Sequence, residues 1–110
     1  IQNMLKLADI TCFDWDADNE RKNDKHSVSM AQAEQVFFKA PLLIRGDAKH
    51  SQQEPRDHAL GSSDDGRLLH LTFTLRQQGS LIRVISARAM HRKERTIYEQ
   101  ADQEGSAPRQ

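Results

Sequence analysis

The stretch from Leu81 to Tyr98 constrains the fold most, because its hydrophobic pattern changes from that of a strand to that of a helix. Aliphatic and β-branched residues open the stretch and favour extended backbone. Strict alternation would place Ile82, Val84, Ser86 and Arg88 on one face and Leu81, Arg83, Ile85 and Ala87 on the other. Helical spacing then relates Met90, Ile97 and Tyr98. The stretch therefore predicts a strand that leads directly into a C-terminal helix.

Positive charge gathers in this same part of the chain. The 16 basic and 16 acidic residues give a formal net charge of zero. Asp14–Glu20 contains four acids in seven residues, whereas the segment Arg76–Arg95 is rich in arginine and contains one acid, Glu94. Two interpretations stay open. The segment is either a solvated helix face with arginines on an edge strand, or a surface that binds phosphates or an acidic partner.

The remaining patterns predict an α+β domain. In Arg67–Arg76 the alternation predicts that Leu69, Leu71, Phe73 and Leu75 face the core, and that Leu68, His70, Thr72 and Thr74 face outward. Shorter strands are expected at Ile10–Trp15, Leu42–Ile44 and Arg56–Gly61, a polar helix at Asp16–Lys25, and a helix from the Ser29–Gln32 capping box to about Phe38. We expect one compact antiparallel sheet of about four strands, with N-terminal helices and a C-terminal helix packed on it.

The length of the chain predicts a single domain over residues 1–104, with a flexible start at residues 1–9 and a disordered tail at Gly105–Gln110. The single cysteine, Cys12, is interpreted as a small buried residue in a reducing compartment. No apolar run approaches the roughly 20 residues of a membrane span. The five histidines and one cysteine show no metal-ligand spacing, so neither a metal nor a cofactor is predicted.

Several short motifs follow one another along the chain. They are Phe13-x-Trp15-Asp16, Asn23 with Lys25-His26, Val28-Ser29, His50-Ser51, Glu54 and Arg56, Leu60-Gly61, Gly66–Leu69, Ile82–Arg88, and Arg92–Arg95 with Tyr98. In this order they resemble the BrnT family, the ribonuclease toxins of bacterial type II toxin–antitoxin systems. The resemblance covers about Ile10 to Glu99. Pro55 departs from it, because it separates a glutamate and an arginine that are usually adjacent in the family.

The resemblance implies a compact RelE-like fold and metal-independent cleavage of RNA in the cytoplasm, with growth arrest as the result. It also implies a cognate BrnA-like antitoxin as partner. Operator DNA would be bound only through the toxin–antitoxin complex, and no membrane would be involved.

Metal-independent cleavage uses the 2′-hydroxyl of the RNA as nucleophile, so the protein must move protons and stabilise charge on the phosphate. Arginine suits the phosphate because its planar guanidinium binds two oxygens and stays charged. The candidates for this role in catalysis are Arg67 and Arg83. Further RNA contacts are expected from Arg76, Arg88 and Arg92. Each of these arginines has a structural alternative, as a surface residue or as the partner of an acid.

Proton transfer requires a group that titrates near neutrality, for which histidine is suited. The candidates are His26, His50 and Glu54, and Lys25 joins them because the Lys25-His26 pair belongs to the resemblance. His58 and His70 are interpreted as structural or solvated residues. A non-catalytic interaction module that binds an acidic partner, or a toxin that has lost its activity, remains the alternative. A catalyst should bring one of the three titratable candidates close to Arg67 or Arg83.

Overall fold

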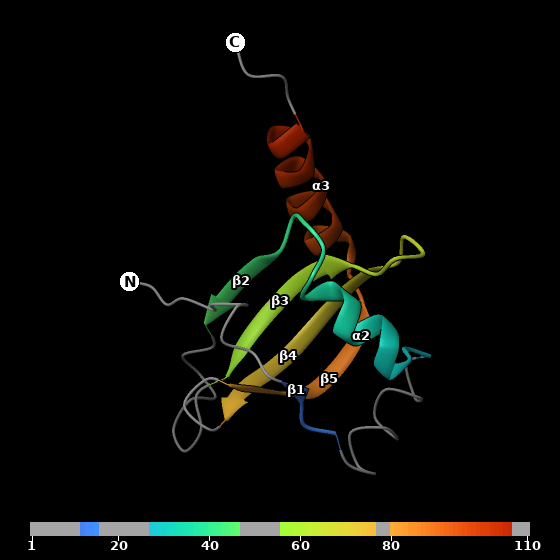
Figure 1. Ribbon diagram of the computed structural model, residues 1–110. Helices are drawn as coiled ribbons and strands as arrows, with labels where there is room; N and C mark the ends of the chain where they lie inside the picture. Colours follow the sequence, from blue (N-terminus) through green and yellow to red (C-terminus); the bar gives the residue numbers. More distant parts are fainter. Residues whose placement is uncertain (1–11, 16–26, 47–55, 77–79, 107–110) are drawn as a thin grey trace.

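A computed structural model describes residues 12–15, 27–46, 56–76 and 80–106 of the chain (Figure 1). Within these ranges the fold is α+β, as the sequence predicts. The elements are β1 (Cys12–Phe13), α2 (Met30–Val36), β2 (Leu43–Gly46), β3 (Asp57–Ser62), β4 (Leu68–Arg76), β5 (Leu81–Ala89) and α3 (Arg92–Ser106). The expected helix at Asp16–Lys25 lies outside the described residues.

The sheet has five strands in the order β1-β5-β4-β3-β2, and the pairs from β5 to β2 are antiparallel. β1 pairs in parallel with β5, with Cys12 opposite Leu81 and Phe13 opposite Ile82. The expectation of about four strands in a purely antiparallel sheet was therefore wrong. The short segment around Phe13 shows a strand pattern, but local alternation does not indicate which distant strand it joins or in which direction.

A register shift between β4 and β5 corrects the predicted faces of β5. Val84 lies opposite Phe73 and Ser86 lies opposite Thr72, so Ile85 is an extra residue on β5, as in a β-bulge. Alternation restarts after this residue. Ile82, Val84 and Ala87 are consequently all buried in the core, whereas Arg83, Ser86 and Arg88 share the opposite face of the sheet.

The alternation predicted for β4 is confirmed on its core face. Leu69, Leu71 and Phe73 are buried, and Leu75 packs against the same core. On the other face, His70 and Thr72 are half-buried, but Thr74 is buried instead of facing solvent as expected.

The helix α2 covers the core face of the sheet (Figure 1). It begins at the predicted capping box, in which the Ser29 hydroxyl accepts a hydrogen bond from the Gln32 N–H and the Gln32 side chain accepts one from the Ser29 N–H, both at 3.0 Å. Ala33, Val36 and Phe37 are buried against the sheet. Burial of this apolar stripe is what holds a helix of only seven residues in place.

The C-terminal helix α3 follows β5 and lies beyond one end of the sheet (Figure 1). Tyr98 attaches it there, since its side chain is buried and its hydroxyl donates a hydrogen bond of 2.9 Å to the Pro41 carbonyl. The helix includes Gly105 and Ser106, which were expected to belong to the disordered tail. Cys12, expected to be buried, is exposed. No helix in the described ranges is long and apolar enough to cross a membrane.

Close approach of α2 to β3 depends on Gly61. A Cβ atom at this position would lie 2.6 Å from Val36 Cγ1 and 3.3 Å from the Val36 carbonyl oxygen. We expect Gly61→Ala to lower the free energy of unfolding by about 1–3 kcal/mol, because the helix must shift away from the sheet. Gly46→Ala is the matched control, since among the described residues its Cβ would meet only Asp57 Oδ1, at 3.5 Å. Urea denaturation of both variants tests this, and equal stability of the two would contradict it.

Candidate active site

The face of the sheet opposite α2 brings polar side chains from four strands together. The register forms two rows across the strands. One row is Arg45, His58, Thr72 and Ser86, and the other is Leu43, Leu60, His70 and Arg88. We call this surface the histidine face. Since apolar residues fill the core face, the histidine face is the candidate site among the described residues.

Two histidines lie at the centre of this face. The rings of His58 and His70 are 4.9 Å apart between centroids and are tilted by 36°. The Thr72 hydroxyl lies 3.0 Å from His58 Nδ1 and orients that ring. His70 Nδ1 is buried and has no hydrogen-bond partner in the described part of the chain. The pair therefore offers two neighbouring groups that can accept or donate a proton.

Arg88 and Glu94 connect the sheet to α3 beside His70. Arg88 donates two hydrogen bonds to Glu94, from its two terminal nitrogens to Oε1 at 2.8 Å and to Oε2 at 2.9 Å. Glu94 Oε1 also accepts the His91 N–H at 2.8 Å, which satisfies a free donor at the start of the helix. This two-pronged ion pair fixes the guanidinium next to the histidines.

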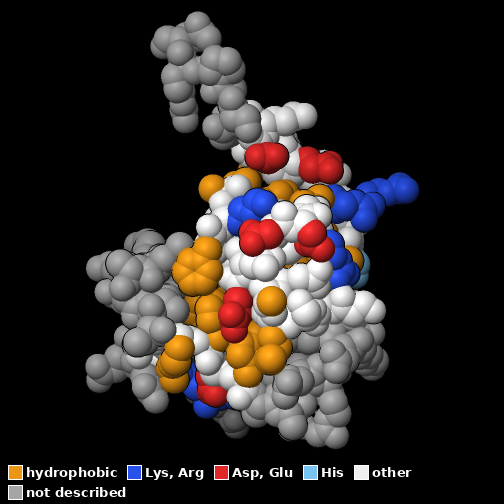
Figure 2. All heavy atoms as spheres, turned by 45° about the vertical axis from the view of Figure 1, so that its right-hand side comes forward, with side chains coloured by type: hydrophobic (Ala, Val, Ile, Leu, Met, Phe, Trp, Pro, Cys, Tyr) orange, Lys and Arg blue, Asp and Glu red, His pale blue; other side chains and the backbone are white. Residues whose placement is uncertain are grey.

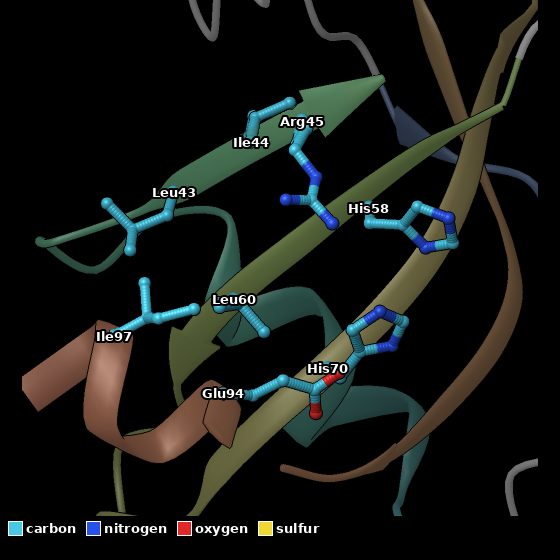
Figure 3. A pocket seen from close by; sticks show the side chains of 8 residues that line it. All are labelled: Leu43, Ile44, Arg45, His58, Leu60, His70, Glu94 and Ile97. Atoms are coloured by element: carbon cyan, nitrogen blue, oxygen red, sulfur yellow. The ribbon is translucent and has the colours of Figure 1, made fainter. Parts of the chain in front are cut away.

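Arg45 approaches the histidines from the other side. It lies on the edge strand β2 directly opposite His58, and its guanidinium points over β3 towards the two imidazole rings (Figure 3). Arg45 is exposed and forms no hydrogen bond or ion pair with any residue that the structure describes. The histidine pair therefore lies between Arg88, which is held by an acid, and Arg45, which is exposed.

Burial and charge set the protonation of the site. Burial is the main cause that lowers the pKa of His70 to about 4, and the positive charge of Arg88 adds to it. His70 is therefore neutral at pH 7. The hydrogen bonds from Arg88 are the main cause that lowers the pKa of Glu94 to about 2, so this carboxylate stays ionised and can only accept hydrogen bonds.

The structure places the two arginines predicted to be catalytic apart from each other. Arg67 lies at the start of α2, where its guanidinium donates to the Ser27 carbonyl at 2.5 Å and to Gln32 Oε1 at 3.2 Å. Arg83 lies opposite Thr74, on the same side of the sheet as the histidine face but beyond its two rows, and forms an ion pair of 3.3 Å with Asp14. Arg83 is thus paired with an acid, as the alternative interpretation anticipated, whereas Arg67 donates to a backbone carbonyl and a glutamine.

The other predicted site residues divide into two groups. Arg88 lies within the histidine face, Arg76 lies at the end of β4, and Arg92 is exposed in the first turn of α3. Lys25, His26, His50 and Glu54 lie outside the described residues, so their roles stay predictions. That one of them approaches Arg67 or Arg83 is likewise still a prediction.

Sequence reasoning did not select the residues at the centre of this candidate site. His58 and His70 were interpreted as structural or solvated, Glu94 was noted only as the single acid of the basic segment and as part of a family motif, and Arg45 was not singled out. A signal did exist for His70, because the alternation of β4 places it on the outward face. The partnership of His58 with His70 depends on the register between β3 and β4, which alternation within one strand does not contain.

The opposite side of the molecule, which carries α2, has a different character. Figure 2 shows hydrophobic and acidic side chains near the middle of this side, with the Lys and Arg side chains mainly above and below them. Phe38 and Met30 are exposed there. Within the described ranges, no group of three or more His, Cys, Asp or Glu side chains is arranged to hold a metal ion.

The two shifted pKa values predict how stability depends on pH. An unfolded His70 takes up a proton near pH 6.5, whereas the folded one does so near 4, so the unfolded state binds more protons as pH falls between these values. The free energy of unfolding should therefore decrease in this window. Urea denaturation measures the free energy of unfolding at pH 7 and at pH 5. Its decrease between the two should be about 1 kcal/mol smaller in His70→Gln than in the unsubstituted protein, after allowance for partial exposure of the ring.

Glu94 serves as a comparison for His70, because it acts in a different pH range. Its contribution to the free energy of unfolding is present above pH 4.5 and is lost only as pH falls towards about 2. Glu94→Gln should therefore change the pH dependence below 4.5. An unchanged loss between pH 7 and pH 5 in His70→Gln would contradict the assignment.

Comparison with known families identifies the family of this chain. A family model described as "Ribonuclease toxin, BrnT, of type II toxin-antitoxin system" matches residues 15–94, which is more than half of the chain. A comparison with curated proteins gives no match. The matched range contains β2 to β5 and ends at Glu94, so it includes every residue of the histidine face. The chain therefore belongs to the BrnT family of ribonuclease toxins of type II toxin–antitoxin systems.

Proposed function

We propose that this BrnT toxin is a metal-independent endoribonuclease that cleaves RNA on its histidine face. In this proposal the protein acts in the cytoplasm, its activity arrests growth, and a cognate BrnA-like antitoxin neutralises it. Operator DNA is reached only through the complex with that antitoxin. The observation that carries the proposal is the position of the His58–His70 pair between Arg45 and Arg88.

The reaction needs no group beyond those on this face. The 2′-oxygen of the RNA attacks the neighbouring phosphorus as its proton passes to one imidazole, and the bond from phosphorus to the 5′-oxygen breaks. The other imidazole gives a proton to that leaving oxygen. The products are a 2′,3′-cyclic phosphate and a 5′-hydroxyl, and the two proton transfers balance.

The protonation of His70 supports its role as the acceptor. Its pKa of about 4 leaves the ring uncharged at pH 7, with a lone pair available for the proton of the 2′-hydroxyl. A low pKa also makes it a weak base, so positioning must contribute to the rate. His58, whose Nδ1 lies against the Thr72 hydroxyl, takes the role of the proton donor.

In this proposal Arg45 and Arg88 stabilise the negative charge on the phosphate. Negative charge grows on the phosphate oxygens as the 2′-oxygen attacks, and a guanidinium positioned in advance stabilises it without reorganisation. Arg45, which is exposed, is assigned to bind the phosphate first. Arg88, held by Glu94, is assigned to the transition state because its position is already fixed.

The antitoxin should neutralise the toxin by covering the histidine face or the segment Asp16–Lys25. A segment of the antitoxin that carries carboxylates would satisfy Arg45 and exclude RNA at the same time.

RNA cleavage by the purified toxin tests the proposal. We expect total RNA to be cleaved in the presence of EDTA, with 2′,3′-cyclic phosphate ends, and an RNA with 2′-deoxyribose at the cleaved position to stay intact. His58→Ala and His70→Gln should each reduce the rate by roughly 10²–10⁴-fold. Arg45→Ala should reduce it by roughly 10²-fold. Lys39→Ala is the matched control, because it removes a positive charge beside α2 and should leave the rate unchanged.

Loss of cleavage in EDTA would contradict metal independence, and full activity of both histidine variants would contradict the assigned site. Arg67→Ala, Arg83→Ala and His50→Ala belong in the same panel, because they test the residues predicted from the sequence. Intact RNA with every protein shown to be folded would favour an interaction module or an inactive toxin.

A further inference from the structure

A pocket of about 360 Å³ opens beside the histidine pair, between the sheet and α3 (Figure 3). One wall is apolar and is formed by Leu43, Leu60 and Ile97. The lining also includes Ile44 at the edge, together with the polar or planar groups of Arg45, the two histidines and the Glu94 carboxylate. Apolar walls with a few converging polar groups are typical of sites for small organic groups.

The apolar wall is incompletely covered by the protein itself. Ile97 is 53% exposed on α3, and Ile44, at the edge of the same pocket, is 41% exposed on β2. Isolated exposed side chains are ordinary on a protein surface. Ile97 faces the hollow, so a flat apolar ligand would cover it, whereas the Ile44 side chain points to the other side of β2, as its pairing with the core residue Ala59 requires (Figure 3).

The polar lining can hold a planar ring. Unstacked RNA bases are commonly bound against imidazole rings and guanidinium planes, with hydrogen bonds to their edges. His58, His70 and Arg45 supply such groups at one side of the pocket, and Leu60 and Ile97 supply the opposite surface. The proposed cleavage chemistry uses the same histidines, so a base in this pocket would lie next to the phosphate that is cleaved.

Glu94 gives the pocket a chemical preference. A carboxylate has about four acceptor positions, and three of them are taken by the two bonds from Arg88 and the one from the His91 N–H. The remaining position, on Oε2, has no donor among the described residues. An ionised carboxylate attracts an amino group and repels a carbonyl oxygen.

Building on the proposed ribonuclease activity, we propose that the pocket binds one base of the RNA that flanks the cleaved phosphate, and that Glu94 favours a base with an exocyclic amino group. Cytosine carries an amino group where uracil of the same size carries a carbonyl. Adenine and hypoxanthine differ in the same way.

The test uses short single-stranded RNAs that differ only at the two positions beside the cleaved phosphate. Each position carries cytidine or uridine, and a second set carries adenosine or inosine. Cleavage rates are measured on the all-ribose forms. Affinities are measured by fluorescence anisotropy on forms with 2′-deoxyribose at the cleaved nucleotide, which cannot react. At one of the two positions, the amino base should bind about tenfold more tightly, the effect of one hydrogen bond to a charged group.

Three variants test which residues cause the base preference and the binding of RNA. In Glu94→Gln the preference between cytidine and uridine should disappear, because the amide can donate as well as accept. Ile97→Glu puts a charge on the exposed apolar wall and should weaken binding of every RNA about tenfold or more. Met30→Ala removes an exposed apolar side chain on the α2 side and serves as control, with affinity unchanged. Ile97→Glu keeps the test valid if Glu94→Gln does not fold.

The possible results separate the two proposals. Cleavage and binding without any preference, and without an effect of Ile97→Glu, would overturn the base pocket and leave the ribonuclease activity in place. Binding that prefers cytidine, combined with no cleavage of any all-ribose RNA, would support the pocket and overturn the catalytic assignment.

Discussion

The pairing of β4 with β5 is the constraint on which the other parts of the structure depend. These are the longest strands, and their ladder carries the shift that makes Ile85 an extra residue. Without the extra residue, Arg88 would lie on the same face of β5 as Ile82 and Val84, and its side chain would enter the core. Burying a guanidinium without a partner costs several kcal/mol. The shift avoids this cost, so that Ala87 packs in the core and Arg88 reaches the histidine face.

Arg88 also connects the fold to the chemistry. Its ion pair with Glu94 joins the end of the sheet to the first turn of α3, and Glu94 completes the hydrogen bonds of that turn. The same positive charge acts with burial to keep His70 uncharged at neutral pH, although Glu94 partly opposes it. One pair of side chains therefore stabilises the junction of sheet and helix and sets the protonation of the neighbouring imidazole.

The arginines of this chain serve two different purposes, and composition alone does not separate them. Arg67 belongs to a polar network that holds the start of α2 against the turn between β3 and β4. Asp65 takes part in this network through Gln32 and the Ser63 hydroxyl, and these hydrogen bonds lower the pKa of its carboxyl. Arg45 has no such contacts in the described part of the chain and is exposed next to the histidines. The segregation of basic residues along the chain therefore did not indicate the roles of the individual arginines.

The sequence by itself determined the elements that depend on local pattern: the alternation of β4, the capping box that begins α2, and the strand that leads into α3. Its motifs also identified the BrnT family. Only the tertiary structure decided that β1 pairs in parallel, that β5 contains an extra residue, and that His58 lies against His70. The physical reason is that side chains alternate with a period of two in any strand, whichever partner it has. The register between strands is chosen by the contacts of residues far apart in the chain, and this choice assembled the histidine face.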